Sequence, residues 1–171
     1  MTDFTLRPWR EADAASIARY ADNAKIAANL RDVFPCPMPH RMRPRLWRAA
    51  SGRRAGVRCA GPLRWTAKLR AASGLFLGSD VYRRSAELGY WLGEPFWGRD
   101  HDRRCGNHVP GGLCSLDIVR IHAEAFARNA ASRRVLEKAG FALEGTLRRS
   151  VYKNGEMLDS CIYALVREEA P

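Results

Sequence analysis

The sequence lacks any apolar run close to the roughly 20 residues that cross a bilayer. Its first ten residues, "MTDFTLRPWR", also lack the apolar segment of a secretory signal peptide. Its five cysteines are an odd number at irregular spacings, which argues against a disulfide framework. These absences predict a cytoplasmic protein. With 171 residues, 46% of them hydrophobic, the chain can bury a substantial core, and we expect residues 1–171 to form a single domain.

Acidic residues are absent from Cys36 to Ala72, a segment that holds ten Lys or Arg residues. This segment supplies +10 of the formal net charge of +11, so the basic character is local. One interpretation is a nucleic-acid-binding protein that uses the Arg-rich segment 41–70, with Trp47 and Trp65 as stacking groups. The other is that arginines without periodicity form no defined surface. We favour the second interpretation and do not expect a nucleic-acid partner.

Four potential metal ligands, His101, Cys105, His108 and Cys114, lie in one short stretch. They lack the paired-cysteine spacing of structural zinc sites. The sequence therefore predicts no metal site, with zinc as the alternative.

Hydrophobic periodicity predicts secondary structure at both ends of the chain. Strands are expected at 3–9, 85–93 and 117–127, helices at 11–21, 24–34 and 129–140, and a hairpin about Asn154-Gly155. Asn129 is a suitable N-cap, and Gly140 stands where a helix ends in the left-handed conformation. Residues 38–73 and 100–115 show no clear period, so we expect an irregular centre.

Three blocks carry a family resemblance: "FTLRPWREADAASIARYADNAKIAANLRDVF", "SAELGYWLGEPFWGR" and "DIVRIHAEAFARNAASRRVLEKAGFALEGTLRRSVYKNGEMLDSCIYAL". Together they resemble the GNAT superfamily of N-acetyltransferases, and more closely its RimJ/RimL-like branch. The most specific part is N-x-x-S-x-x-V-L-E-K-x-G-F after a strand. The resemblance implies an α/β (α+β) fold with a mixed, mostly antiparallel central sheet flanked by helices. It also implies an enzyme that transfers an acetyl group from acetyl-CoA to a primary amine. The acceptor would be a protein N-terminus, such as a ribosomal protein alanine, or a small amine.

In this family the fourth and fifth strands part and hold acetyl-CoA, and the segments 86–92 and 118–126 match those strands. The resemblance implies that backbone groups of Leu92 and Gly93 bind the pantetheine arm and that one N–H group faces the thioester oxygen. Gly98 and Arg99 would begin the phosphate-binding loop.

Further roles follow from the same resemblance. Asn129 and Ser132 match residues beside the cofactor sulfur, and Ser132 would protonate or solvate the departing thiolate. Because an amine at neutral pH is mostly protonated, a base is needed; Glu87 is the first choice and Glu124 the second. The alternative for each carboxylate is a solvated or ion-paired strand residue. His122 is expected to be a packed strand residue.

The glycine-rich phosphate loop that the family places after Arg99 is missing. The residues Asp100–Cys114 can be written with codons that, when the reading frame is shifted by one nucleotide, encode an apolar, helix-favouring segment. The same exercise on Arg64–Gly74 yields a strand, an Asp-Gly turn and a strand. We therefore hypothesise that residues 38–73 and 100–115 are out of frame relative to an ancestral acetyltransferase. The chain would then be a GNAT protein with a damaged centre, and a catalytically impaired descendant is an alternative function. The sequence predicts neither the oligomeric state nor the identity of the amine.

Overall fold

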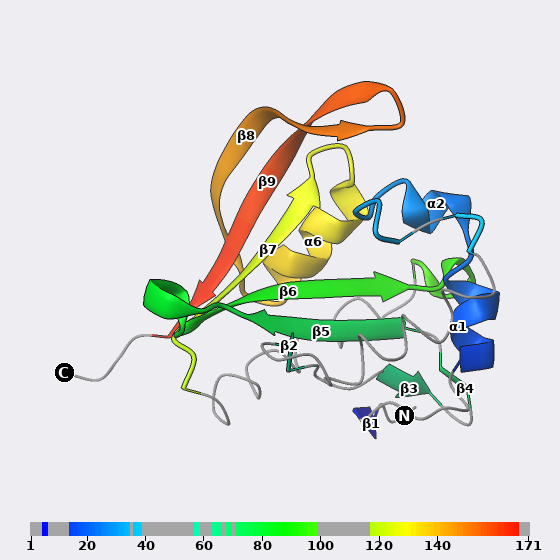
Figure 1. Cartoon of the computed structure of the whole chain (residues 1–171), viewed down its shortest axis with the longest axis horizontal. Helices are drawn as coiled ribbons and strands as arrows, with labels where there is room; N and C mark the ends of the chain where they lie inside the picture. Colours follow the sequence, from blue (N-terminus) through cyan, green and yellow to red (C-terminus); the bar gives the residue numbers. More distant parts are fainter. Residues whose placement is uncertain are drawn as a thin grey trace. The chain divides into compact units, whose positions relative to one another are not determined.

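The structure of the protein is a computed structural model. It describes residues 5–6, 14–34, 36–38, 57–58, 63–65, 68–69, 71–98 and 117–167 (Figure 1). The helices are α1 (Ala14–Tyr20), α2 (Ala24–Ala27) and α6 (Ala130–Lys138), with 3-10 turns η2 (Asp80–Tyr82) and η3 (Glu94–Phe96). The strands are β1 (Thr5–Leu6), β2 (Val57–Arg58), β3 (Leu63–Trp65), β4 (Lys68–Leu69), β5 (Ala71–Leu77), β6 (Ser85–Leu92), β7 (Arg120–Phe126), β8 (Ala142–Lys153) and β9 (Glu156–Val166).

The chain divides into two compact units. The first comprises residues 1–76 and 89–99, and the second comprises residues 77–88 and 100–171. The expectation of a single domain over residues 1–171 stays a prediction.

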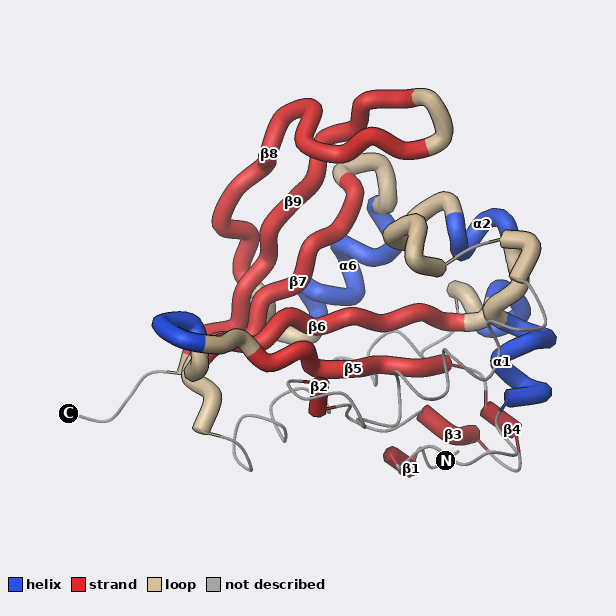
Figure 2. The backbone as a smooth tube through the Cα atoms, viewed as in Figure 1, coloured by secondary structure: helices blue, strands red, loops and turns tan. Residues whose placement is uncertain are grey.

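The second unit is built on the antiparallel strands β7, β9 and β8. Strand β9 lies in the middle and pairs with β7 from Arg120↔Val166 to Phe126↔Ser160. Its other edge pairs with β8 from Ala142↔Ala164 to Lys153↔Glu156, so the two strands form a long hairpin (Figure 2). The turn at Asn154-Gly155 has φ values of 50° and 85°, which is the left-handed pair that a type I′ hairpin requires. The predicted hairpin is confirmed.

Helix α6 follows β7 and is closed at both ends by the residues that the sequence singled out. Asn129 is the N-cap, and its side-chain oxygen accepts a hydrogen bond from the Ser132 N–H at 3.2 Å. Gly140 follows the helix with φ +87°, a conformation that glycine adopts without a steric penalty. Leu136, on the apolar side of α6, is 1% exposed. Both predicted caps are confirmed.

Strand β6 pairs in parallel with β7 over three positions, Ser85↔Arg120, Ala86↔Ile121 and Glu87↔His122. β6 then continues to Leu92 and β7 to Phe126 beyond this register. The strand order in this sheet is β2-β5-β6-β7-β9-β8. The pairs β2–β5, β7–β9 and β8–β9 are antiparallel. The expected mixed, mostly antiparallel sheet is confirmed.

In the first unit both predicted helices are present. α1 ends at Tyr20, and positions 11–13 of the helix predicted over 11–21 lie outside the described residues. α2 ends at Ala27, whereas the periodicity predicted a helix over 24–34. After Ala27 the N–H groups of Asn29 and Leu30 bond three residues back, to Ile26 and Ala27. The Asn29 side chain also donates to the Lys25 carbonyl at 3.1 Å, so it competes with the helical pattern.

Short strands also occur in the segment where the sequence showed no period. β3 pairs antiparallel with β1 and β4, and β2 pairs antiparallel with β5. Strands of two or three residues are too short to leave a recognisable alternation, so sequence reasoning missed them.

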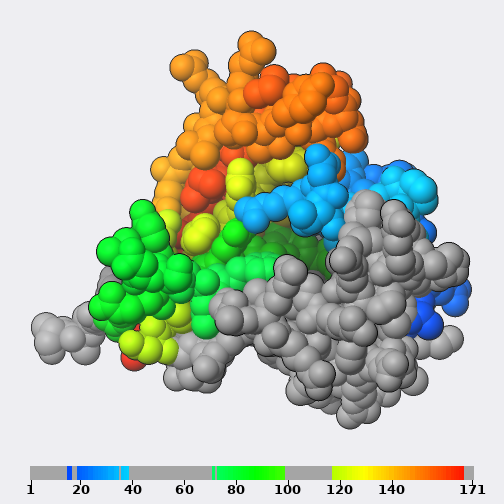
Figure 3. Space-filling model, viewed as in Figure 1, coloured from blue at the N-terminus to red at the C-terminus, as the bar shows by residue number. Residues whose placement is uncertain are grey.

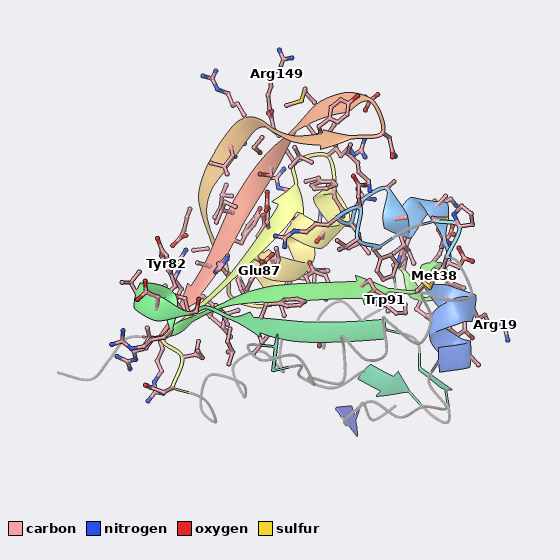
Figure 4. All side chains as sticks on the ribbon, in the orientation of Figure 1. Arg19, Met38, Tyr82, Glu87, Trp91 and Arg149 are labelled. Atoms are coloured by element: carbon pink, nitrogen blue, oxygen red, sulfur yellow. The ribbon has the colours of Figure 1, made fainter. Side chains whose placement is uncertain are left out.

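Strand β8 is an edge strand whose regular pairing with β9 is interrupted by shifts in register. Its register with β9 shifts between Leu147 and Val151, and within that shift Arg149 has φ +51°. The Arg149 N–H donates to the Asp159 carboxylate at 2.8 Å, and the Ser150 and Ser160 hydroxyls lie 2.8 Å apart. The space-filling view shows the β8 side chains on the surface of this unit, and the Arg149 side chain points outward (Figures 3 and 4). Such a bulge prevents continuous pairing along the edge.

Candidate active site

Glu87, the first choice for a catalytic base, lies on β6 in the second unit (Figure 4). It is half-buried, and its register partner on β7 is His122, which is also half-buried. Glu124, the second choice, is exposed two residues further along β7. Since side chains on a strand alternate between faces, Glu87, His122 and Glu124 share one face of the sheet.

The opposite face of these strands carries the core of the unit and helix α6. It is lined by residues at alternate positions: Ala86, Ile121, Ala123, Cys161 and Tyr163, each 2% exposed or less. Tyr163 lies directly opposite Ala123, and its hydroxyl contacts α6. Glu87 and α6 are therefore on different faces of the sheet.

Asn129 and Ser132 lie together in the first turn of α6, joined by the capping hydrogen bond, and both are half-buried. This turn follows the end of β7 at Phe126. Glu87 pairs with His122, which lies four residues before the end of β7 at Phe126. Four strand residues span about 13 Å. The register thus predicts that Glu87 and Ser132 act on different atoms of a substrate and not as a hydrogen-bonded pair.

A polar cluster that sequence reasoning missed connects the buried Tyr163 of β9 to the half-buried Arg133 and the exposed Glu137 of α6. The Tyr163 hydroxyl accepts a hydrogen bond from Arg133 Nε at 3.1 Å and donates one to Glu137 Oε1 at 2.8 Å. Burial raises the pKa of Tyr163 above its ordinary value, so the hydroxyl stays neutral. The hydrogen bond to Tyr163 raises the pKa of Arg133. The only sequence signal was the spacing of Arg133 and Glu137, which places both on one side of a helix.

In the first unit, residues 92–98 form a compact turn after β6. The Leu92 carbonyl accepts a hydrogen bond from Trp97 Nε1 at 2.8 Å, and the Gly93 carbonyl accepts one from the Phe96 N–H at 2.9 Å. Gly93 is buried and precedes η3. Gly98 is exposed with φ +68°, and a Cβ built on it would meet no atom within 4 Å. Among the described residues, no atom therefore blocks approach to the backbone at Gly98.

The same turn is held to the start of α2 by a second cluster that sequence reasoning missed. Glu94 accepts hydrogen bonds from the Lys25 ammonium and from Asn23 Nδ2, the latter at 2.7 Å. The bond from Lys25, followed by that from Asn23, lowers the pKa of Glu94. Asn23 also caps α2, since its side-chain oxygen accepts from the Lys25 N–H at 2.8 Å. An Asn directly before the helical segment "AKIA" is a sequence signal for the cap. The contact of Asn23 with Glu94 has no such signal, because the two residues are 71 positions apart.

Several predictions concern residues outside the part of the chain that the structure describes. These are Arg99 and the four potential zinc ligands His101, Cys105, His108 and Cys114. Within the described residues, no group of three or more His, Cys, Asp or Glu side chains is placed to hold a metal ion. None of the described helices combines the length and apolar character that crossing a bilayer requires.

Comparison with known proteins gives matches in sequence and in fold. "Uncharacterized N-acetyltransferase YoaA" of Bacillus subtilis is 34% identical over 113 residues, covering 66% of this chain and 63% of that protein. "Putative ribosomal N-acetyltransferase YdaF" of the same organism is 33% identical over 91 residues, covering 53% of this chain and 50% of that protein. The matches thus span between half and two thirds of these relatives.

Solved structures share the fold at lower identity. RimL, a ribosomal L7/L12 alpha-N-protein acetyltransferase solved in complex with coenzyme A, superposes with a TM-score of 0.85. It is 19% identical, and the match covers 98% of this chain and 96% of RimL. The ribosomal-protein-S5-alanine acetyltransferase of Vibrio fischeri gives a TM-score of 0.79 at 19% identity, with coverage of 99% and 96%. The profile of the acetyltransferase (GNAT) domain matches residues 3–142. The chain therefore belongs to the GNAT acetyltransferase family, and its likeness to RimJ/RimL-type proteins is confirmed.

Proposed function

We propose that this protein is an N-acetyltransferase that transfers the acetyl group of acetyl-CoA to a primary amine, and that the acceptor is the N-terminal amine of a protein. Family membership supports the reaction. The acceptor is supported by the relative named for ribosomal N-acetylation and by the fold neighbours named for acetylation of ribosomal proteins. Coenzyme A or acetyl-CoA is bound in two of the fold neighbours, RimL and the microcin C7 self-immunity acetyltransferase MccE.

In this proposal Glu87 removes a proton from the ammonium form of the acceptor, directly or through a water molecule. The neutral amine attacks the thioester carbonyl, and the oxygen gains negative charge. A backbone N–H group at Leu92 or Gly93 stabilises that oxygen. As the C–S bond breaks, the nitrogen gives up its second proton and the departing thiolate gains one, either passed through the Ser132 hydroxyl or with that hydroxyl solvating the sulfur. The acetylated amine and coenzyme A are then released. Asn129 holds the first turn of α6, which carries Ser132.

The phosphate-binding role is assigned to Gly98 and Arg99. The left-handed backbone and the open space at Gly98 support it, since no described atom lies within 4 Å of the place that a side chain would occupy. The glycine spacing that the family places after Arg99 is absent from the sequence, so we expect weak binding of acetyl-CoA.

The observation that carries the proposal is the register of β6 and β7. The two strands pair in parallel only from Ser85↔Arg120 to Glu87↔His122, although both continue for several residues. A capped helix with Asn129 and Ser132 follows β7 directly. This combination is what the family resemblance predicts for the fourth and fifth strands and the helix after them.

The test uses the whole chain and follows release of the free thiol of coenzyme A. The acceptor is a short peptide with an N-terminal alanine, and the control is the same peptide with its N-terminus already acetylated. We expect turnover with the first peptide only. Turnover of a lysine side chain or a small amine in preference to the N-terminal amine would overturn the assignment of the acceptor.

Binding is measured separately by calorimetric titration with acetyl-CoA and by its effect on the melting temperature. Binding without turnover would identify a catalytically impaired descendant. A protein that binds neither acetyl-CoA nor its peptide acceptor but retains RNA in a salt-sensitive way would favour the Arg-rich segment as the functional element. A variant with residues 38–73 and 100–115 restored to the alternative frame should bind acetyl-CoA more tightly, if the frame hypothesis is correct.

A further inference from the structure

We propose that Tyr163 is a positioning residue for acetyl transfer, because its hydroxyl fixes the first turn of α6, with Asn129 and Ser132, to the central strand of the second unit. This inference deepens the proposed function and depends on it. Tyr163 does not reach the reacting atoms in this scheme. It acts through Arg133, the residue next to Ser132.

The contacts that carry the proposal join three elements. Tyr163 on β9 accepts a hydrogen bond from Arg133 Nε at 3.1 Å and donates one to Glu137 at 2.8 Å. Arg133 uses a second nitrogen, Nη1, to reach the Ala127 carbonyl at 3.4 Å, in the turn between β7 and α6. The hydroxyl therefore connects β9 to α6, and through Arg133 the connection extends to the turn that leads into α6.

The Tyr163 end of this connection is buried, whereas Arg133 is half-buried and Glu137 is exposed. Tyr163 is 0% exposed, and its neighbour in the β7 register is Ala123, whose side chain is small. Leu136 of α6 is buried in the core of the unit and adds an apolar contact. Apolar contacts allow small shifts along the helix axis, whereas a hydroxyl with one donor and one acceptor partner defines a single position.

The consequence concerns Ser132. It precedes Arg133 directly and lies five residues before Glu137, so a shift of α6 along the sheet would move its hydroxyl away from the thiolate. Displacements of about 1 Å at a reacting group can lower the rate by about 100-fold. Removal of the Tyr163 hydroxyl should therefore lower kcat more than it changes the KM for acetyl-CoA.

The experiment compares Tyr163→Phe, Ser132→Ala and the double variant, with Tyr152→Phe as the matched control. Tyr152 is 68% exposed, so loss of its hydroxyl should change nothing. We expect Tyr163→Phe to lower kcat by about 10-fold to 100-fold, with little change in KM. In the Ser132→Ala background, Tyr163→Phe should have almost no further effect on kcat, because both changes remove the same contribution, that of the positioned Ser132 hydroxyl.

A multiplicative effect of the two substitutions would overturn the proposal, since a loss of folded protein would multiply with any catalytic defect. Unchanged kcat in Tyr163→Phe would overturn it as well, while leaving the proposed function intact. Amide hydrogen exchange gives a readout without turnover: protection at residues 130–133 should fall in Tyr163→Phe and not in Tyr152→Phe. A wild-type chain that shows no acetyl transfer would overturn both proposals together.

Discussion

Replacement of Asn129 by alanine isolates the contribution of the α6 cap to stability. The Asn129 side-chain oxygen accepts from the Ser132 N–H at 3.2 Å, and alanine leaves this N–H group without that partner. Loss of an N-cap acceptor typically lowers the free energy of unfolding by about 1 kcal/mol. For a chain of 171 residues this corresponds to a fall in melting temperature of about 2–4 °C.

The assay is chemical denaturation of Asn129→Ala beside Asn129→Asp, with thermal melts as a second measure. Aspartate keeps an acceptor at the same position and carries a negative charge, which the N-terminus of a helix favours, so it should retain the wild-type stability. If Asn129→Ala is as stable as the wild type, or if Asn129→Asp loses as much, the cap does not stabilise α6. A loss of acetyl transfer in both variants at unchanged stability would instead indicate a direct role beside the cofactor.

Three further predictions address other positions. Gly140→Ala should lower the free energy of unfolding by about 1 kcal/mol through φ +87° alone, because the nearest atom to the added Cβ is 3.9 Å away; a denaturation curve that matches the wild type would contradict this. Since Lys25 lowers the pKa of Glu94, stability from this pair is present above the ordinary carboxyl pKa and is lost as pH falls through the lower folded value. Melts between about pH 3 and pH 6 should show this loss in the wild type and less of it in Glu94→Gln. Glu87→Gln should lower kcat by about 100-fold or more and leave acetyl-CoA binding unchanged, whereas Glu124→Gln should be active; the reverse order would make Glu124 the base.

The features that the sequence predicted correctly depend on contacts between near neighbours along the chain. The Asn129 cap closes on the third residue after it, and the left-handed residues at Gly140 and at Asn154-Gly155 need no distant partner. The alternation in 85–92 likewise reports a half-buried strand, because successive side chains face opposite sides of a sheet. Such signals act within one turn or one strand and are therefore readable without knowledge of the fold.

Features that sequence reasoning missed join residues distant in the chain. Tyr163 meets Arg133 and Glu137 only because β9 lies beside β7 and α6 covers that face. Glu94 meets Lys25 across 69 positions of sequence. The left-handed Arg149 depends on the Asp159 carboxylate across the hairpin and has no local signature.

The sequence by itself determined the type of the longer local elements, the caps of α6 and the family likeness, since these depend on residue order over short spans. The tertiary structure decided which face of the sheet Glu87 shares with His122 and which buried hydroxyl holds α6. The physical reason is that strand register, and with it every cross-strand contact, is set by how whole faces pack, and a shift of one residue would exchange the two faces.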